Sequence, residues 1–249
     1  LVLHYKEKLK LRKKRPIIMV QTQKLTRNLY LIGEVQDDNV LTIIQNIHEI
    51  NDIDAELGLA SDDREPIRLF INSPGGAVSS MLGLISVIES SETPIHTHAI
   101  GEAMSAALLI FVVGHVRVVY KNSLFMYHSI GSGTQGDITY IENYHEFTKQ
   151  LQNKYDEILT KYTTFELLEL KDICERRKDY YFDYKQALAK GLADEIEIND
   201  LYEDDLNYIK ENYPDYTKQI IDISSLIQNI PVEDLVAFIS QYKEEEEAD

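Results

Sequence analysis

The chain of 249 residues is long enough for one large domain, and its 44% hydrophobic content is ordinary for a globular protein. Its net charge of −17 argues against nucleic acid as the main ligand, because phosphate binding needs a basic surface. No stretch approaches the roughly 18 uncharged apolar residues of a membrane-spanning helix, so we expect no membrane partner. The one cysteine, Cys174, excludes an internal disulfide and suits a cytoplasmic protein.

Charge divides the chain into three parts. Residues 1–16 carry seven Lys or Arg against one acid, and we expect them to form a basic, mobile N-terminal arm. Residues 194–249 contain 17 acids and three lysines, a balance of −14. Within them, apolar residues recur at helical spacing over 199–249, which predicts an acidic, helical C-terminal appendage with a disordered tail. Residues 17–198 are the predicted main domain.

Strands and helices alternate along this main domain. The expected elements are a strand at 28–36, a helix from 37 to 50, a strand at 67–73, a helix at 77–90, a strand at 94–101, a helix that begins at Ser105, strands at 116–120 and 123–128, and a helix over 137–162. Asp37 or Asp38 would cap the first helix. Repeated strand–helix units predict an α/β fold with a mainly parallel sheet.

Three short motifs lie at the ends of these elements. The glycines of "INSPGG" (71–76) allow the backbone to approach a ligand closely and to present N–H groups to an anion. Ser105 stands at a helix N-terminus, which favours developing negative charge. His128 ends an apolar strand just before a glycine-rich loop. Each motif alone is more often structural, as a tight turn, a small helix-start residue or a packed histidine.

Together with "KDYYFDYKQALAKGLADEI" (178–196), these motifs resemble the proteolytic subunit of the Clp protease (ClpP). The resemblance covers residues 17–198, and phage-type relatives of that family share the same motifs. The match has four parts, in chain order. The family's oxyanion turn corresponds to Ile71–Gly76, its nucleophile to Ser105, its histidine to His128 and its acid to Asp179. Four motifs in the right order and at the right spacing are a specific signal.

The resemblance implies a serine endopeptidase. Ser105 would be the nucleophile, His128 its general base, and Asp179 the acid that orients the histidine. The backbone N–H groups of Gly76 and Ala106 would form the oxyanion hole. No cofactor and no metal is implied.

The resemblance also implies the surroundings of that site. Substrate would lie beside Gly75 and Gly131, in a ClpP/crotonase-like spiral of repeated β-β-α units with 137–162 as the family's long handle helix. Family members form homo-oligomeric rings, heptamers that can stack into a tetradecamer, and an AAA+ unfoldase ATPase feeds them unfolded proteins. Because no Walker-type glycine loop is present, any ATP would be used by such a partner.

The chain departs from the family pattern at three places. The Met-Gly that usually follows the serine is Ala106-Ala107, and the Gln-Pro that follows the histidine is Ser129-Ile130. The arginine that commonly precedes the acid, a ring-contact residue in the family, is Lys178. Lysine cannot form a planar, bidentate pair with a carboxylate, so the number of subunits stays open.

The sequence leaves several alternatives open. Asp172, Glu175 and Asp183 are near enough in sequence to be mistaken for the acid. His96 and His98 share one strand face, but without a Cys or acidic partner we expect packing rather than metal binding. The alternative functions are an acyl-CoA hydratase or thioesterase of the same fold, a weakly active structural ring subunit, and a phage-type capsid maturation protease.

Overall fold

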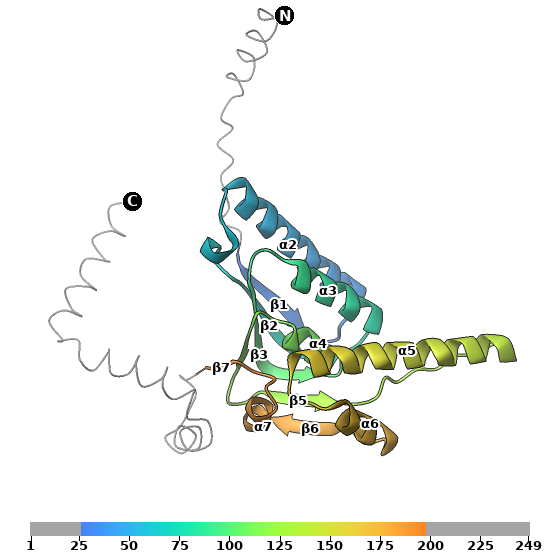
Figure 1. Ribbon diagram of the computed structural model, residues 1–249. Helices are drawn as coiled ribbons and strands as arrows, with labels where there is room; N and C mark the ends of the chain where they lie inside the picture. Colours follow the sequence, from blue (N-terminus) through green and yellow to red (C-terminus); the bar gives the residue numbers. More distant parts are fainter. Residues whose placement is uncertain (1–25, 198–249) are drawn as a thin grey trace, which may run out of the picture.

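Seven strands form one sheet in residues 26–197, the part of the chain that the computed structural model describes (Figure 1). The strands are β1 (Asn28–Ile32), β2 (Ile67–Ser73), β3 (Ile95–Met104), β4 (Val116–Val119), β5 (Leu124–Tyr127), β6 (Tyr180–Asp183) and β7 (Glu195–Ile196). The helices are α2 (Asp37–Glu56), α3 (Val78–Ser90), α4 (Ala106–Val112), α5 (Ile138–Tyr162), α6 (Leu167–Glu175) and α7 (Tyr184–Ala189). The predicted N-terminal arm and C-terminal appendage lie outside the described residues.

The long strand β3 organises the sheet. The order β1-β2-β3-β4-β7 is parallel throughout. The first half of β3 pairs with β4 at residues 96–99, whereas its last residues, 102–104, pair with β5. Strand β6 then runs antiparallel to β5. The predicted mixed α/β fold is confirmed.

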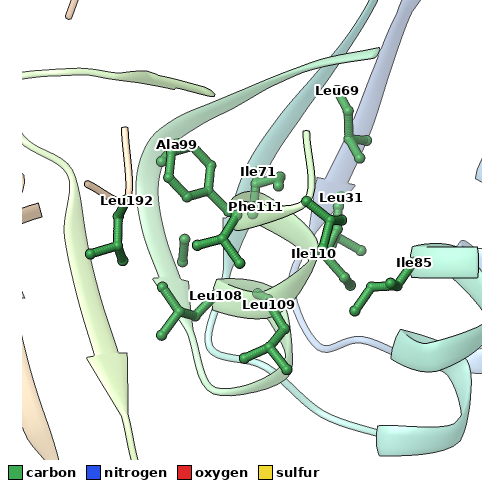
Figure 2. Close-up of a cluster of buried hydrophobic side chains, with 14 of the residues drawn as sticks. Leu31, Leu69, Ile71, Ile85, Ala99, Leu108, Leu109, Ile110, Phe111 and Leu192 are labelled. Atoms are coloured by element: carbon green, nitrogen blue, oxygen red, sulfur yellow. The ribbon is translucent and has the colours of Figure 1, made fainter. Parts of the chain in front are cut away.

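Helix α4 lies at the centre of the hydrophobic core. All seven of its residues are buried, and Figure 2 shows Leu108, Leu109 and Phe111 among side chains from the strands. A helix that is apolar on every side belongs inside a protein rather than at its surface. Because α4 is enclosed on all sides, its first turn has a fixed position.

Several elements differ from the sequence expectation: α2 continues to Glu56 rather than ending at residue 50, and β3 continues to Met104 rather than ending at residue 101. Strand β1 ends at Ile32 rather than at residue 36, because Gly33 has a φ of +80° and turns the chain. Gln36, not Asp37 or Asp38, caps α2, and its backbone N–H donates to Asn39 Oδ1 at 3.0 Å. Strands β6 and β7 were not predicted.

The predicted long helix is present as α5, with Asp137 as its N-cap. Tyr155 and Leu159, near its C-terminal end, are buried in the core. Its N-terminal half extends beyond the body of the domain (Figure 1), and the Ile138 residue there is 76% exposed. Within residues 26–197 no helix is both long and apolar enough to cross a membrane.

A buried ion pair joins the chain before β1 to the C-terminal part of α2. Asp54 is fully buried, and both its oxygens accept hydrogen bonds from the Arg27 guanidinium. Thr93 Oγ1 donates a further bond to Asp54 at 2.8 Å. These contacts, with the hydrogen bond from Arg27 foremost, lower the pKa of Asp54 despite its burial.

We expect Asp54→Asn to lower the free energy of unfolding at pH 7 by about 3 kcal/mol, because Arg27 loses its anionic partner. A lowered native pKa means that the stabilisation is complete above the ordinary carboxyl pKa of about 4 and is lost as the pH falls through the lowered value. Urea unfolding over this pH range measures it, with the exposed neighbour Asp52→Asn as control. If the difference in the free energy of unfolding between Asp54→Asn and the wild type stays constant into strong acid, this account is contradicted.

Candidate active site

Ser105 stands in a strained conformation between β3 and α4. Its φ of 52° and ψ of −123° are rare for a residue with a side chain. Two backbone hydrogen bonds hold it: Ser105 N–H donates to the Met126 carbonyl at 2.8 Å, and Leu108 N–H donates to the Ser105 carbonyl at 3.0 Å. Such strain persists only where the surroundings impose it, and it is concentrated at functional sites.

The glycine turn packs directly against this serine. A Cβ on Gly75 would lie 2.7 Å from both the Met104 carbonyl oxygen and Ser105 Cβ, and one on Gly76 would lie 2.3 Å from the Val35 carbonyl oxygen. Both residues also have positive φ, so only glycine fits. Two backbone hydrogen bonds tie this turn to Val35: Val35 N–H donates to the Gly75 carbonyl, and Ala77 N–H donates to the Val35 carbonyl. The N–H of Gly76, between them, takes part in neither bond.

Strand pairing brings the histidine and the acid together. Tyr127 of β5 is opposite Tyr180 of β6, so the next pair in this antiparallel register is His128 and Asp179. His128 Nε2 lies 2.8 Å from Ser105 Oγ, and His128 Nδ1 lies 3.5 Å from Asp179 Oδ1. The second contact is longer than a good hydrogen bond, as is common in enzymes without substrate.

Two of the three alternative acids make structural contacts elsewhere. Asp172 pairs with Arg176 at 2.8 Å in the last turn of α6. Asp183 caps α7 by accepting a backbone N–H at 2.9 Å. Glu175 is the exposed last residue of α6. Of these four carboxylates, Asp179 is the one that lies within ion-pair distance of the histidine.

A cleft of about 350 Å³ opens in front of the serine. Its walls include Ser105, His128, Gly75, Gly76, Gly131 and Tyr155. Five of the predicted site residues thus line this one cleft, whereas Ala106 and Asp179 are not among its walls. Ala106 directly follows the serine in the chain, and Asp179 lies within 3.5 Å of the His128 ring. The cleft is large enough for a few residues of an extended peptide.

Tyr155 is a residue of this cleft that the sequence did not single out. It is buried, and its hydroxyl makes no hydrogen bond within the described part of the chain. Burial raises the pKa of Tyr155 far above its usual range, and the nearby Ser105 hydroxyl offsets this only in part. The phenol is therefore neutral beside the serine. In the sequence Tyr155 is visible only as one position of an apolar helix stripe.

A buried polar network supports the loop after His128. Gln152 Oε1 accepts the Ile130 N–H at 2.7 Å, and Gln152 Nε2 donates to Asp156 at 2.7 Å. Tyr127 O–H also donates to Asp156, at 2.6 Å. Helix α5 therefore fixes the residues on both sides of the histidine.

The remaining candidates take no part in this site. Within residues 26–197 no three His, Cys, Asp or Glu side chains are grouped as metal ligands. Cys174 Sγ lies 3.3 Å from the Tyr127 hydroxyl, and burial raises the pKa of the thiol, which makes it a poor nucleophile.

A serine on a strained strand-to-helix turn, next to an imidazole with a carboxylate behind it, is the arrangement of a serine hydrolase. The model of the Clp protease family matches residues 18–200, well over half of the chain. The chain belongs to the Clp protease family, and it is a protease of that type.

Tyr155→Phe should leave the free energy of unfolding unchanged or slightly raise it, because the variant removes a buried hydroxyl that has no hydrogen-bond partner within residues 26–197. Tyr127→Phe is the matched comparison, since its hydroxyl bonds Asp156 and its loss should cost about 1–3 kcal/mol. Urea unfolding of both variants measures the difference. If both variants lose the same free energy of unfolding, the Tyr155 hydroxyl is hydrogen-bonded in the folded protein.

Proposed function

We propose that the protein is a serine endopeptidase with Ser105 as nucleophile, His128 as general base and Asp179 as the acid that orients the histidine. The observation that carries the proposal is the distance of 2.8 Å between His128 Nε2 and Ser105 Oγ on a strained turn. A serine hydroxyl is a weak nucleophile without such a base.

In the first half of the reaction, Ser105 Oγ attacks the carbonyl carbon of a peptide bond. Its proton passes to His128 Nε2, while the Nδ1–H faces Asp179, which stabilises the imidazolium. The carbonyl oxygen becomes an oxyanion and accepts hydrogen bonds from the N–H groups of Gly76 and Ala106. Each such donor is worth about 3–4 kcal/mol in the transition state.

In the second half, the C–N bond breaks and the imidazolium gives its proton to the leaving amine. A water molecule then attacks the acyl-enzyme, and His128 takes its proton. Release of the carboxylic acid returns the proton to Ser105 Oγ. Gly75 and Gly131 would hold the substrate backbone in the cleft.

We further propose that the protein forms a homo-oligomeric ring, a heptamer that can stack into a tetradecamer, in the cytoplasm. Proteins of the Clp protease family generally form rings with ATPase partners. The exposed apolar residues Ile138, Ile141 and Phe147 of α5 support the assembly, because a helix that projects into water gains nothing from them. An AAA+ ATPase would deliver unfolded proteins to the ring.

A second candidate is a weakly active ring subunit that supports other, active subunits. The observation that favours it is the loose contact of 3.5 Å between His128 and the half-exposed Asp179. A capsid maturation protease would use the same three residues and would differ in its substrate.

Ser105→Ala should abolish hydrolysis of a fluorogenic peptide, a loss of about six powers of ten in kcat. Asp179→Asn should lower kcat by about 10⁴-fold, because the histidine then favours the wrong tautomer. Asp172→Asn, a nearby exposed acid, is the matched control and should retain activity. If Asp179→Asn cleaves as fast as this control, Asp179 is not the acid that orients the histidine. A wild type that cleaves no faster than Ser105→Ala would favour the second candidate.

Ile138→Glu combined with Ile141→Glu should lower the mass of the assembly that the protein forms in solution, because the two substitutions would place two charges in the contact between subunits. Leu168→Glu on α6 is the control, since Leu168 is as exposed as Ile138 at 76% but lies on a different helix. Light scattering or native mass spectrometry measures the mass. An active wild-type monomer at micromolar concentration would contradict the ring.

A further inference from the structure

The two faces of the sheet are covered differently. Alternate residues of a strand point to opposite faces, and on β1 Leu29 and Leu31 are buried in the core. On the opposite face, Tyr30 is 57% and Ile32 53% exposed, and Ile100 of β3 is 38% exposed. This second face is thus open in the described part of the chain, and beside its apolar residues it carries the exposed Arg68 and the partly exposed His96.

A row of rings crosses this open face from strand to strand. The ring centroids of Tyr30 and Phe70 are 5.3 Å apart, those of Phe70 and His98 4.8 Å, and those of His98 and Tyr120 6.3 Å. We call these four residues the aromatic row. Both ring nitrogens of His98 are buried and without a hydrogen-bond partner in the described chain. Burial lowers the pKa of His98 to about 4, so the row is uncharged at neutral pH.

The chain leaves the described residues at one end of the aromatic row. Strand β7 pairs with β4 at the edge of the sheet, and the Glu197 N–H donates to the Val119 carbonyl at 2.8 Å. Val119 directly precedes Tyr120, the last ring of the row. Glu197, the last described residue, is therefore bonded to the residue next to Tyr120.

The sequence of that segment suits an apolar surface of this size. Ten apolar residues recur at helical spacing: Leu206, Ile209, Ile220, Ile221, Ile223, Leu226, Ile227, Leu235, Phe238 and Ile239. From β7 to β1 the sheet is four strand spacings wide, about 19 Å, which a helix of about 13 residues spans. Residues 199–242 are more than long enough.

We propose that residues 199–242 of the same chain cover the aromatic row. A second copy or another protein are the other possible occupants. The chain's own segment is favoured because its tether to β7 gives it a millimolar effective concentration at the row. Its own apolar residues must also be buried against another surface. A protein that binds this face must first displace the segment. The inference does not rest on the proposed catalytic function.

Photo-crosslinking of the full chain tests the occupant. Tyr30 is replaced by p-benzoylphenylalanine in a mixture of ¹⁴N- and ¹⁵N-labelled protein, with Leu57, also exposed but at the end of α2, as the control position. We expect Tyr30 crosslinks within one chain to peptides of residues 199–242, and none from Leu57. Crosslinks to another copy, or to no part of the segment, overturn the proposal.

Hydroxyl-radical footprinting of the full chain provides a second test. Ile223→Glu combined with Ile227→Glu should raise the oxidation rate of Tyr30 several-fold, because the segment is released. Ser225→Glu combined with Asn229→Glu adds the same charge at polar positions and should change nothing.

Oxidation of the buried Tyr127 reports an intact core in each variant. Equal Tyr30 oxidation in the wild type and both double variants overturns the proposal.

Discussion

The hydrogen bond from Ser105 N–H to the Met126 carbonyl joins the end of β3 to β5, the strand that directly precedes His128. It holds a residue whose backbone conformation costs on the order of 1–3 kcal/mol by itself. Two features offset this cost: the complete burial of α4, and the approach of Gly75 that no other residue would allow. The distance from serine to histidine follows from this one turn.

Helix α5 contributes to the site and to the surface at once. Its C-terminal half closes the core behind the cleft through Tyr155, and Gln152 and Asp156 anchor the chain around His128. Its N-terminal half carries exposed apolar side chains away from the body. Because one continuous helix does both, a neighbour that holds the exposed half would also steady the loop beside the histidine.

The sequence indicated the strand–helix order and the motif residues, because these depend on local patterns. The family resemblance favoured Asp179 over its acidic neighbours, but local patterns do not show which acid faces the histidine, since that depends on β6, a four-residue strand that pairs with β5 across more than 50 residues of chain. The place of Tyr155 in the cleft was not predicted, for a related reason. An apolar helix stripe does not show which of its members lines a cleft and which projects into solvent.

Covalent labelling with a fluorophosphonate probe tests the central claim most directly, because the probe reacts only with an activated serine. The adduct is located by mass spectrometry of peptides from the folded protein and from protein unfolded in urea. Our account predicts a single adduct, on Ser105, that forms in the folded protein and not in the unfolded one. An adduct on another residue, or none in the folded protein, would contradict it.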